Sequence, residues 1–342
     1  MNKIIVDEYK KISELISIGN IKDKSVLVTG ANGLIGSYIV DYLSYLNSTR
    51  MAGITIYALA RSKKKLKTRF KNNNNIQIVE QDLNKPLNFD KKVDYIIHTA
   101  SNAHPLAFAQ DPVGTMKTNL FGTMNLLELT KKSNGKFLYL STGEIYGNNT
   151  DKPFTENDLG IIDTKLVRSC YPESKRAAET LCMAYNYQYG VNVNIARLCY
   201  VYGATITDTN SRADAQFLRN ALNHENIVIK SEGLQRRTYC YIADCVSGLL
   251  KILLEGCDGE VYNISNPISI VSVKEYALTL ASIAGVDLIF ELPEENERKG
   301  YSKPADSILD STKLQSLGWK PFYNIYNGLK NTMEILKGIK NV

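Results

Sequence analysis

Tyr171 and Lys175 are the residues of this sequence whose types and spacing most directly suggest chemistry, because they stand four residues apart in the segment 170–176. On a helix, this spacing places both side chains on one face. There an ammonium favours the phenolate and lowers the phenol's pKa from its usual value of roughly 10. Such a tyrosine can exchange a proton with a sugar hydroxyl or ketone. The same pair also arises by chance on helices, so its meaning depends on a dinucleotide and a pocket nearby.

A glycine-rich turn stands where a dinucleotide would bind. Residues 30–36 read Gly-Ala-Asn-Gly-Leu-Ile-Gly; they follow an apolar strand at 25–29 and open a helix that runs to about Leu46. Glycines allow a tight turn and close approach of a pyrophosphate, and the helix start offers free N–H groups. The spacing is G-x-x-G-x-x-G, and a glycine triplet can also be a mere turn. The strand-turn-helix context nevertheless predicts cofactor binding.

The end of the second strand indicates which dinucleotide binds. A carboxylate there would bond the ribose 2′-hydroxyl of NAD, whereas an arginine accommodates the 2′-phosphate of NADP. The segment 60–63 contains Arg61 and no carboxylate. We therefore predict NADP, with NAD as the alternative if Arg61 only solvates the strand end. Asp82 and Leu83 close the third strand, where the carboxylate either meets the adenine or forms a turn.

The elements that must position these residues alternate along the chain. Apolar strands are expected at 25–29, 54–60, 76–79, 93–98, 137–140 and 193–198, with helices that include 115–132 and 172–189. This alternation predicts an α/β fold: a doubly wound parallel sheet of the Rossmann type, with a smaller C-terminal α/β substrate lobe. The predicted divisions are a helical N-terminal extension at 1–23, a dinucleotide-binding domain at 24–203 to which 238–258 returns, and a substrate lobe at 204–237 and 259–342.

Composition narrows the classes of function. With 342 residues, 44% of them hydrophobic, the chain can bury a large core in two lobes. A net charge of +6 is well below the basic charge that is typical of nucleic-acid-binding proteins. Three histidines, and six cysteines without metal-ligand spacing, predict no metal site. We find no signal peptide and no apolar run long enough to span a membrane, which predicts a cytoplasmic protein without a membrane partner.

Taken together, these motifs resemble the extended short-chain dehydrogenase/reductases, the family of NAD(P)-dependent nucleotide-sugar epimerases, dehydratases, decarboxylases and ketoreductases. The resemblance covers roughly residues 24–335. Its motifs are the glycine turn, the segments 98–101, 118–123 and 141–147, and Tyr171 with Lys175. The segments 168–171 and 235–244 look most like those of UDP-glucuronate decarboxylases.

The resemblance implies a role for individual residues. Thr142 would bond the reacting C4 oxygen, Tyr171 would be the acid/base, and Lys175 would hold the nicotinamide ribose. Glu144 matches a catalytic carboxylate of dehydratases and decarboxylases, or else it only caps a helix. The implied substrate contacts are His104, Tyr200, Arg212 and Arg237. Of these, Arg237 would bind a diphosphate. The implied cofactor contacts are Gly30, Asn32, Gly33, Leu34, Ile35, Gly36, Arg61, Ser62, Asp82, Leu83, Thr99, Ala100, Ser101, Asn119, Tyr171 and Lys175.

The shared chemistry implied is hydride transfer at C4 of a nucleoside-diphosphate hexose. Arg61, Gly143 and the segment 306–310 favour a 4-ketoreductase, which is our prediction. Glu144 favours the alternative, a redox-neutral 4-epimerase or UDP-glucuronate decarboxylase-like enzyme. A third possibility is a cofactor-binding regulator without turnover. By analogy with the family, apolar faces on the two helices at 115–132 and 172–189 predict a homodimer.

Overall fold

Seven parallel strands form the central sheet of the computed structural model, which describes residues 2–71, 73, 75–147, 152–207, 210–291 and 305–340. The strands are β1 (Ser25–Thr29), β2 (Thr55–Ala60), β3 (Ile76–Glu80), β4 (Tyr95–His98), β5 (Lys136–Thr142), β6 (Asn192–Leu198) and β10 (Glu260–Ile264). Their order across the sheet is β10-β6-β5-β4-β1-β2-β3, and every neighbouring pair runs parallel. The predicted doubly wound α/β fold is therefore confirmed.

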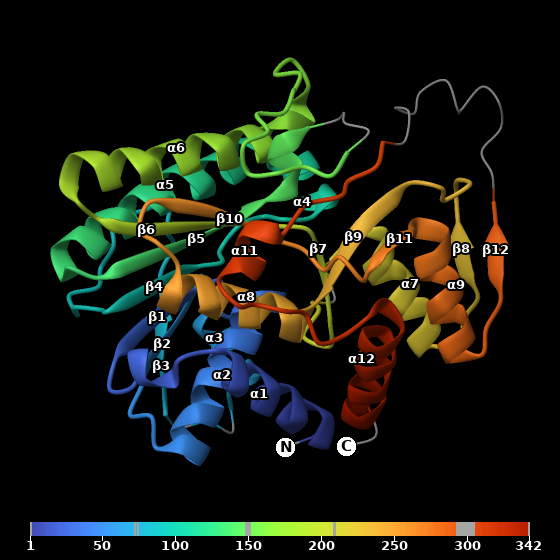
Figure 1. Cartoon of the computed structure of the whole chain (residues 1–342), viewed down its shortest axis with the longest axis horizontal. Coiled ribbons are helices and arrows are strands. Elements are labelled where there is room, and N and C mark those ends of the chain that lie inside the picture. The colour runs from blue at the N-terminus through green and yellow to red at the C-terminus, as the bar shows by residue number, and fades with distance from the viewer. Residues whose placement is uncertain are drawn as a thin grey trace.

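Helices cover both faces of this sheet (Figure 1). On one face lie α5 (Pro112–Ser133) and α6 (Cys170–Tyr189), and on the other lie α2 (Leu34–Arg50) and α8 (Ile242–Glu255). The residues of β1 alternate between the two faces: Leu27 joins the apolar cluster beneath α5 and α6, while Val26 and Val28 join the cluster beneath α2 and α8. Because both faces are covered, the strands read as continuous apolar runs.

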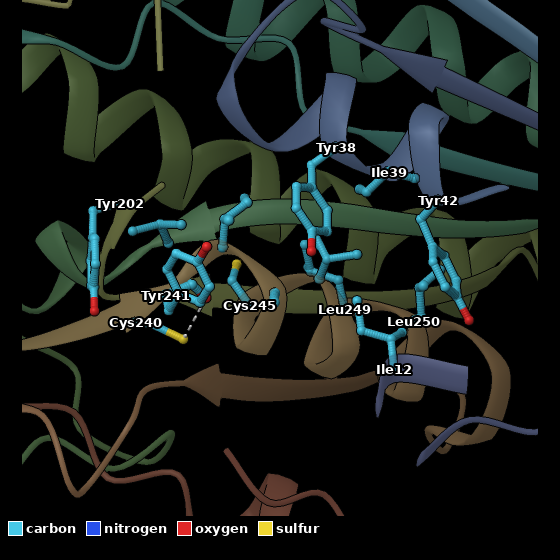
Figure 2. Packing of buried hydrophobic residues seen from close by; sticks show 14 of the residues in the cluster. Ile12, Tyr38, Ile39, Tyr42, Tyr202, Cys240, Tyr241, Cys245, Leu249 and Leu250 are labelled. Atoms are coloured by element: carbon cyan, nitrogen blue, oxygen red, sulfur yellow. Dashed lines mark hydrogen bonds between the residues drawn. The ribbon is translucent and has the colours of Figure 1, made fainter. Parts of the chain in front are cut away.

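The helix predicted in the N-terminal extension forms α1 (Lys3–Leu15), and it is part of the core. Tyr9 and Ile12 are buried, and Figure 2 shows Ile12 beside side chains of α2 and α8. Glu8 is also buried, and its carboxylate accepts hydrogen bonds from the hydroxyls of Tyr38 at 2.7 Å and Tyr241 at 2.6 Å. These bonds tie α1 to α2 and to the strand that leads into α8.

The smaller lobe has two short sheets packed with helices (Figure 1). One sheet contains β7 (Tyr200–Tyr202), β9 (Arg236–Tyr241) and β11 (Ile270–Ser272), and the other contains β8 (Ile227–Ile229) and β12 (Leu288–Phe290). The helices of this lobe are α7 (Ala213–Leu222), α9 (Val273–Ala284) and α12 (Ile325–Lys340). Short helices elsewhere are α3 (Lys63–Arg69), α4 (Pro105–Gln110), α11 (Thr312–Ser316), η1 (Ile18–Asn20), η2 (Gly143–Tyr146) and η3 (Val167–Ser169).

Two strands correct the predicted domain boundaries. The sequence pattern assigns 259–342 to the substrate lobe, but β10 pairs with β6 at the edge of the central sheet. The pattern also assigns 24–203 to the dinucleotide-binding domain, but β7 pairs with β9 in the smaller lobe. Both strands are short, and each finds its partner far away along the chain. A local pattern of apolar residues cannot reveal such a partner.

Candidate active site

The turn between β1 and α2 has the geometry of a phosphate-binding loop. Gly30 adopts a φ of +62°, which favours glycine. A Cβ on Gly30 would lie 2.8 Å from the Thr99 hydroxyl oxygen, and one on Gly36 would lie 2.5 Å from the Gly30 carbonyl oxygen. Gly33 precedes the first turn of α2, and no side chain caps that turn. Its backbone N–H groups are therefore available to an anion, and the phosphates of a dinucleotide fit this turn.

A cavity of about 570 Å³ joins this turn to the carboxyl ends of the central strands. The predicted site residues that line it are Gly30, Asn32, Gly33, Leu34, Ile35, Arg61, Asp82, Leu83, Thr99, Ala100, Ser101, His104, Thr142, Glu144, Tyr171, Tyr200, Arg212 and Arg237. Open α/β sheets bind ligands at this edge, because the loops that follow the strands meet there. The cavity thus brings the glycine turn and Tyr171 into one site.

Four predicted site residues lie behind the wall of this cavity. Gly36 packs against the glycine turn, and Ser62 caps α3. Asn119 is buried and accepts a hydrogen bond of 2.8 Å from the hydroxyl of Ser101, which does line the cavity. Lys175 is buried in α6. None of these four residues is part of the cavity surface.

One end of the cavity is lined by Arg61, Gln81 and Asp82, where the adenosine of a dinucleotide would lie. Arg61 is exposed directly after β2. The nearby Glu80 carboxylate is occupied, because it accepts the backbone N–H of Lys63 at 2.9 Å. Asp82 forms a turn with the amide two residues further on, at 3.0 Å, as the structural alternative expects. Of the residues that line this end of the cavity, Arg61 carries the positive charge.

Tyr171 lies in the first turn of α6, with its ring buried against Phe108 of α4. The two rings are stacked with their centroids 5.4 Å apart. Burial raises the pKa of the Tyr171 phenol, and the Glu144 carboxylate raises it further, while a hydrogen bond with Thr142 opposes the change. These contacts favour the protonated phenol at neutral pH. The lowering of its pKa predicted from the spacing is therefore wrong.

The ammonium of Lys175 is bonded to another part of the chain. Its Nζ donates to the backbone oxygen of Leu140 on β5 at 2.7 Å and lies 4.8 Å from the centre of the Tyr139 ring. Burial lowers the pKa of Lys175 to about 7, although the Glu179 carboxylate one turn further along α6 raises it. The lysine shares a helix with Tyr171 but does not act on its phenol in this structure.

Glu144 lies on η2, two residues after Thr142. Its backbone N–H donates to the Thr142 hydroxyl oxygen at 3.2 Å, and its Oε2 forms an ion pair of 3.0 Å with Nη2 of Arg168. Gly143 stands between the two predicted catalytic residues and faces Leu309, whose Cδ1 would lie 2.8 Å from a Cβ at that glycine. An acidic side chain at this position would therefore have to move the leucine.

The other end of the cavity carries positive charge. The guanidinium of Arg237 lies 4.5 Å from the centre of the Tyr200 ring, and Arg212 and Arg168 also line this space. Burial and the neighbouring Arg212 lower the pKa of His104. Guanidinium groups suit phosphate and carboxylate oxygens, so this end can bind more than one anionic group.

Several residues that line the cavity were missed in the sequence analysis, among them Gln81, Asn102, Pro105, Arg168, Asp214 and Ser307. For Arg168 a signal existed, since it stands three residues before Tyr171 in a motif already singled out. The others lie on loops and at the starts of helices α4 and α7, which only the tertiary structure brings together. Among the described residues, no three His, Cys, Asp or Glu side chains are grouped so that they could hold a metal ion. None of the helices described there has the length and apolar character needed to cross a bilayer.

Sequence comparison links this chain to one family. The NAD dependent epimerase/dehydratase family matches residues 26–265. UDP-glucuronic acid decarboxylase 6 of Arabidopsis thaliana is 34% identical over 304 residues, which cover 89% of this chain and 86% of that protein. UDP-glucuronic acid decarboxylase 1 of Danio rerio is 30% identical, over 91% of this chain and 72% of that protein. The similarity therefore extends over both lobes.

Solved structures share the same architecture. UDP-glucose 4-epimerase of Thermotoga maritima, solved with UDP-glucose, has a TM-score of 0.78 and 26% identity, covering 92% of this chain and 99% of that chain. A dTDP-glucose 4,6-dehydratase of Streptomyces venezuelae, solved with NAD, has a TM-score of 0.79 and 23% identity, covering 93% and 98%. The second likeness concerns the fold alone. The comparisons agree with a cofactor of the NAD(P) type and lend no support to a preference for NADP.

Proposed function

Because this chain belongs to the NAD dependent epimerase/dehydratase family, within the extended short-chain dehydrogenase/reductases, we propose that it acts on a nucleoside-diphosphate hexuronic acid. In the proposed reaction the C4 hydroxyl is oxidised, the C6 carboxyl leaves as CO₂, and C4 is reduced again. The observation that carries the proposal is the single cavity that contains Thr142, Glu144, Tyr171 and four arginines. The UDP-glucuronic acid decarboxylases at 34% and 30% identity support the same substrate class.

The chemistry divides among the residues of the cavity. When bound, the NAD(P) cofactor supplies the acceptor and later the donor of the hydride. Thr142 and Tyr171 hold the C4 oxygen, and Tyr171 takes and returns its proton. Arg212 and Arg237 hold the diphosphate. A ketone at C4 makes the substrate a β-keto acid, so the electrons of the breaking C5–C6 bond enter the carbonyl as an enolate. Glu144 is the acid/base for the proton that replaces CO₂ at C5.

Incubation with UDP-glucuronic acid and either NAD or NADP tests this function. We expect release of CO₂ and formation of a UDP-pentose, both detected by mass spectrometry, with no net change in nicotinamide absorbance. The absorbance is unchanged because the hydride removed from C4 is returned to C4. A protein that binds UDP-glucuronic acid but releases no CO₂ from it would contradict the proposal.

A net 4-ketoreductase is the second candidate, and Arg61 at the adenosine end of the cavity favours it. Such an enzyme would draw its hydride from NADPH in each turnover. The discriminating measurement is NADPH consumption with 4-keto sugar nucleotides. One NADPH oxidised for each sugar reduced, together with no CO₂ from UDP-glucuronic acid, would favour the reductase.

We also propose that Arg61 binds the 2′-phosphate of NADP, since it is exposed on the cavity wall and the segment 60–63 holds no carboxylate. Arg61→Ala should weaken NADPH binding roughly 10-fold or more, which is the loss expected for a charge-assisted hydrogen bond, and should leave NADH binding unchanged. Arg50→Ala is the matched control, because Arg50 is exposed at the far end of α2. Equal effects on both nucleotides would count against this role.

Self-association through α5 and α6 is proposed on the basis of their outer faces. Phe121 and Met124 on α5, and Met183 on α6, are 46%, 39% and 38% exposed. The two helices pack on each other, so these side chains share one surface of the molecule. Large apolar side chains gathered on one face of a chain favour burial against a second copy, which supports a homodimer.

A further inference from the structure

Arg168 lies on the wall of the catalytic cavity, in the short helix η3 that leads directly into α6. Its guanidinium carbon lies 5.6 Å from the centre of the Phe108 ring, and Phe108 stacks on Tyr171. Arg168 and the acid/base therefore contact the same aromatic ring. On its other side, Arg168 reaches the Glu144 carboxylate at 3.0 Å. A carboxylate thus already occupies this guanidinium inside the cavity.

The pair of Arg168 and Glu144 is held less firmly than a buried, hydrogen-bonded pair. The side chain of Arg168 is 61% exposed and that of Glu144 is 31% exposed. Oε2 of Glu144 is buried, but it forms no hydrogen bond with the described residues, only the ion pair. The buried pair of Arg197 and Glu179 is different: these side chains are 12% and 9% exposed, and both Nε and Nη2 of the arginine donate to the carboxylate. A guanidinium offers five N–H donors in a fork that fits a carboxylate. A ligand carboxylate can therefore replace Glu144 on Arg168 at low cost.

Two further arginines of the cavity, Arg212 and Arg237, come from the smaller lobe. Arg212 directly precedes the first residue of α7, and its Nε donates to Oδ1 of Asn210 at 3.4 Å. Arg237 lies on β9, over Tyr200. Those two suit the diphosphate of a sugar nucleotide, as proposed above. In a hexuronic acid the carboxyl carbon is two bonds from C4, so its binding group must stand close to the acid/base, as Arg168 does.

We propose that Arg168 recognises the carboxylate of the hexuronic acid and takes it in exchange for Glu144. This inference rests on the proposed function. The exchange discriminates against neutral hexoses, which cannot displace Glu144 from the guanidinium. It also frees the Glu144 carboxylate, beside Thr142, for proton transfer.

Binding measurements test this role without any need for turnover. The dissociation constants of UDP-glucuronic acid and UDP-glucose are measured by calorimetry for the wild-type protein, Arg168→Gln and Arg168→Lys. For Arg168→Gln we expect roughly 10- to 100-fold weaker binding of UDP-glucuronic acid and at most a few-fold change for UDP-glucose. Arg168→Lys keeps the charge but loses the fork, so it should retain part of the preference. Glu144→Gln removes the competing carboxylate and should bind UDP-glucuronic acid at least as tightly as the wild type.

Arg176→Gln is the matched control, because Arg176 is paired with Glu173 on α6 and does not line the cavity. It should keep the wild-type preference. If Arg168→Gln prefers UDP-glucuronic acid as strongly as the wild type does, the role of Arg168 is wrong and the proposed function stands. If the wild type binds UDP-glucuronic acid no better than UDP-glucose, the proposed substrate class itself is wrong, and this inference fails with it.

Discussion

Replacing Tyr171 by phenylalanine tests the active site with a minimal change. The substitution removes one hydroxyl and keeps the ring, so the stacking on Phe108 is preserved. The structural loss is the hydrogen bond with Thr142, which costs about 0.5–1.5 kcal/mol in the free energy of unfolding. The glycine turn is formed by other residues and is not altered. The variant should therefore fold, and it should bind a dinucleotide within a few-fold of the wild-type affinity.

The effect on turnover should be far larger than the effect on stability. General acid–base catalysis contributes roughly 10²- to 10⁴-fold, which corresponds to about 3–5 kcal/mol in the activation barrier. The phenylalanine ring has no group that can take or return the proton of the C4 hydroxyl. The assay is the initial rate of UDP-glucuronic acid conversion, followed by mass spectrometry. Dinucleotide affinity is measured in parallel by nicotinamide fluorescence.

The control for this substitution is Tyr187→Phe, since Tyr187 is 94% exposed on the same helix. It should match the wild type in every measurement. Turnover of Tyr171→Phe within about tenfold of the wild type would refute the acid/base assignment. An unchanged activity of every kind would instead support a regulator that binds a cofactor without turnover. Loss of dinucleotide binding together with turnover would assign the hydroxyl a structural role.

Three other perturbations follow from the same geometry. Gly33→Val places a branched side chain at the start of α2, and it should weaken dinucleotide binding by tenfold or more in fluorescence titrations, whereas Gly19→Ala, which meets nothing within 4 Å, should not. Burial lowers the pKa of Lys175 to about 7, below its unfolded value of about 10.4. Between these values the unfolded chain binds more protons than the folded protein. The free energy of unfolding of the wild type, measured relative to Lys175→Met in urea titrations, should therefore rise from about pH 7 to about pH 10. A flat or falling difference would contradict this. Phe121→Glu should convert a dimer into a monomer in light scattering, and a monomeric wild type would rule out the proposed dimer.

The sequence predicted the central sheet well, because its strands are buried on both faces. Such strands favour apolar residues at successive positions, and this preference appears as short apolar runs, of which 25–29 coincides with β1. The glycine turn was predictable for a similar reason. Gly30 must adopt a positive φ and Gly36 must pack against a backbone oxygen, so the residue type itself records the local geometry.

The sequence was less informative where a partner lies far along the chain. The strands β7 and β10 are both short, yet they belong to different sheets. Nothing local in Arg168 shows that its partner is Glu144, which stands 24 positions earlier. The structure of the smaller lobe was the hardest to predict from the sequence, because its short strands and loops have few periodic apolar patterns.

Tyr171 and Lys175 show which properties follow from the sequence alone and which depend on the tertiary structure. The sequence by itself determined that Tyr171 and Lys175 share a helix and that a glycine turn precedes them, because spacing and residue type dictate such local features. Only the tertiary structure decided their electrostatics. It buries Tyr171 against Phe108 and directs Lys175 toward the Leu140 carbonyl, so the phenol's pKa rises where the spacing alone predicts a fall. The physical reason is that a pKa depends on the solvent and charges around a group in space, and those are set by segments far apart in the sequence.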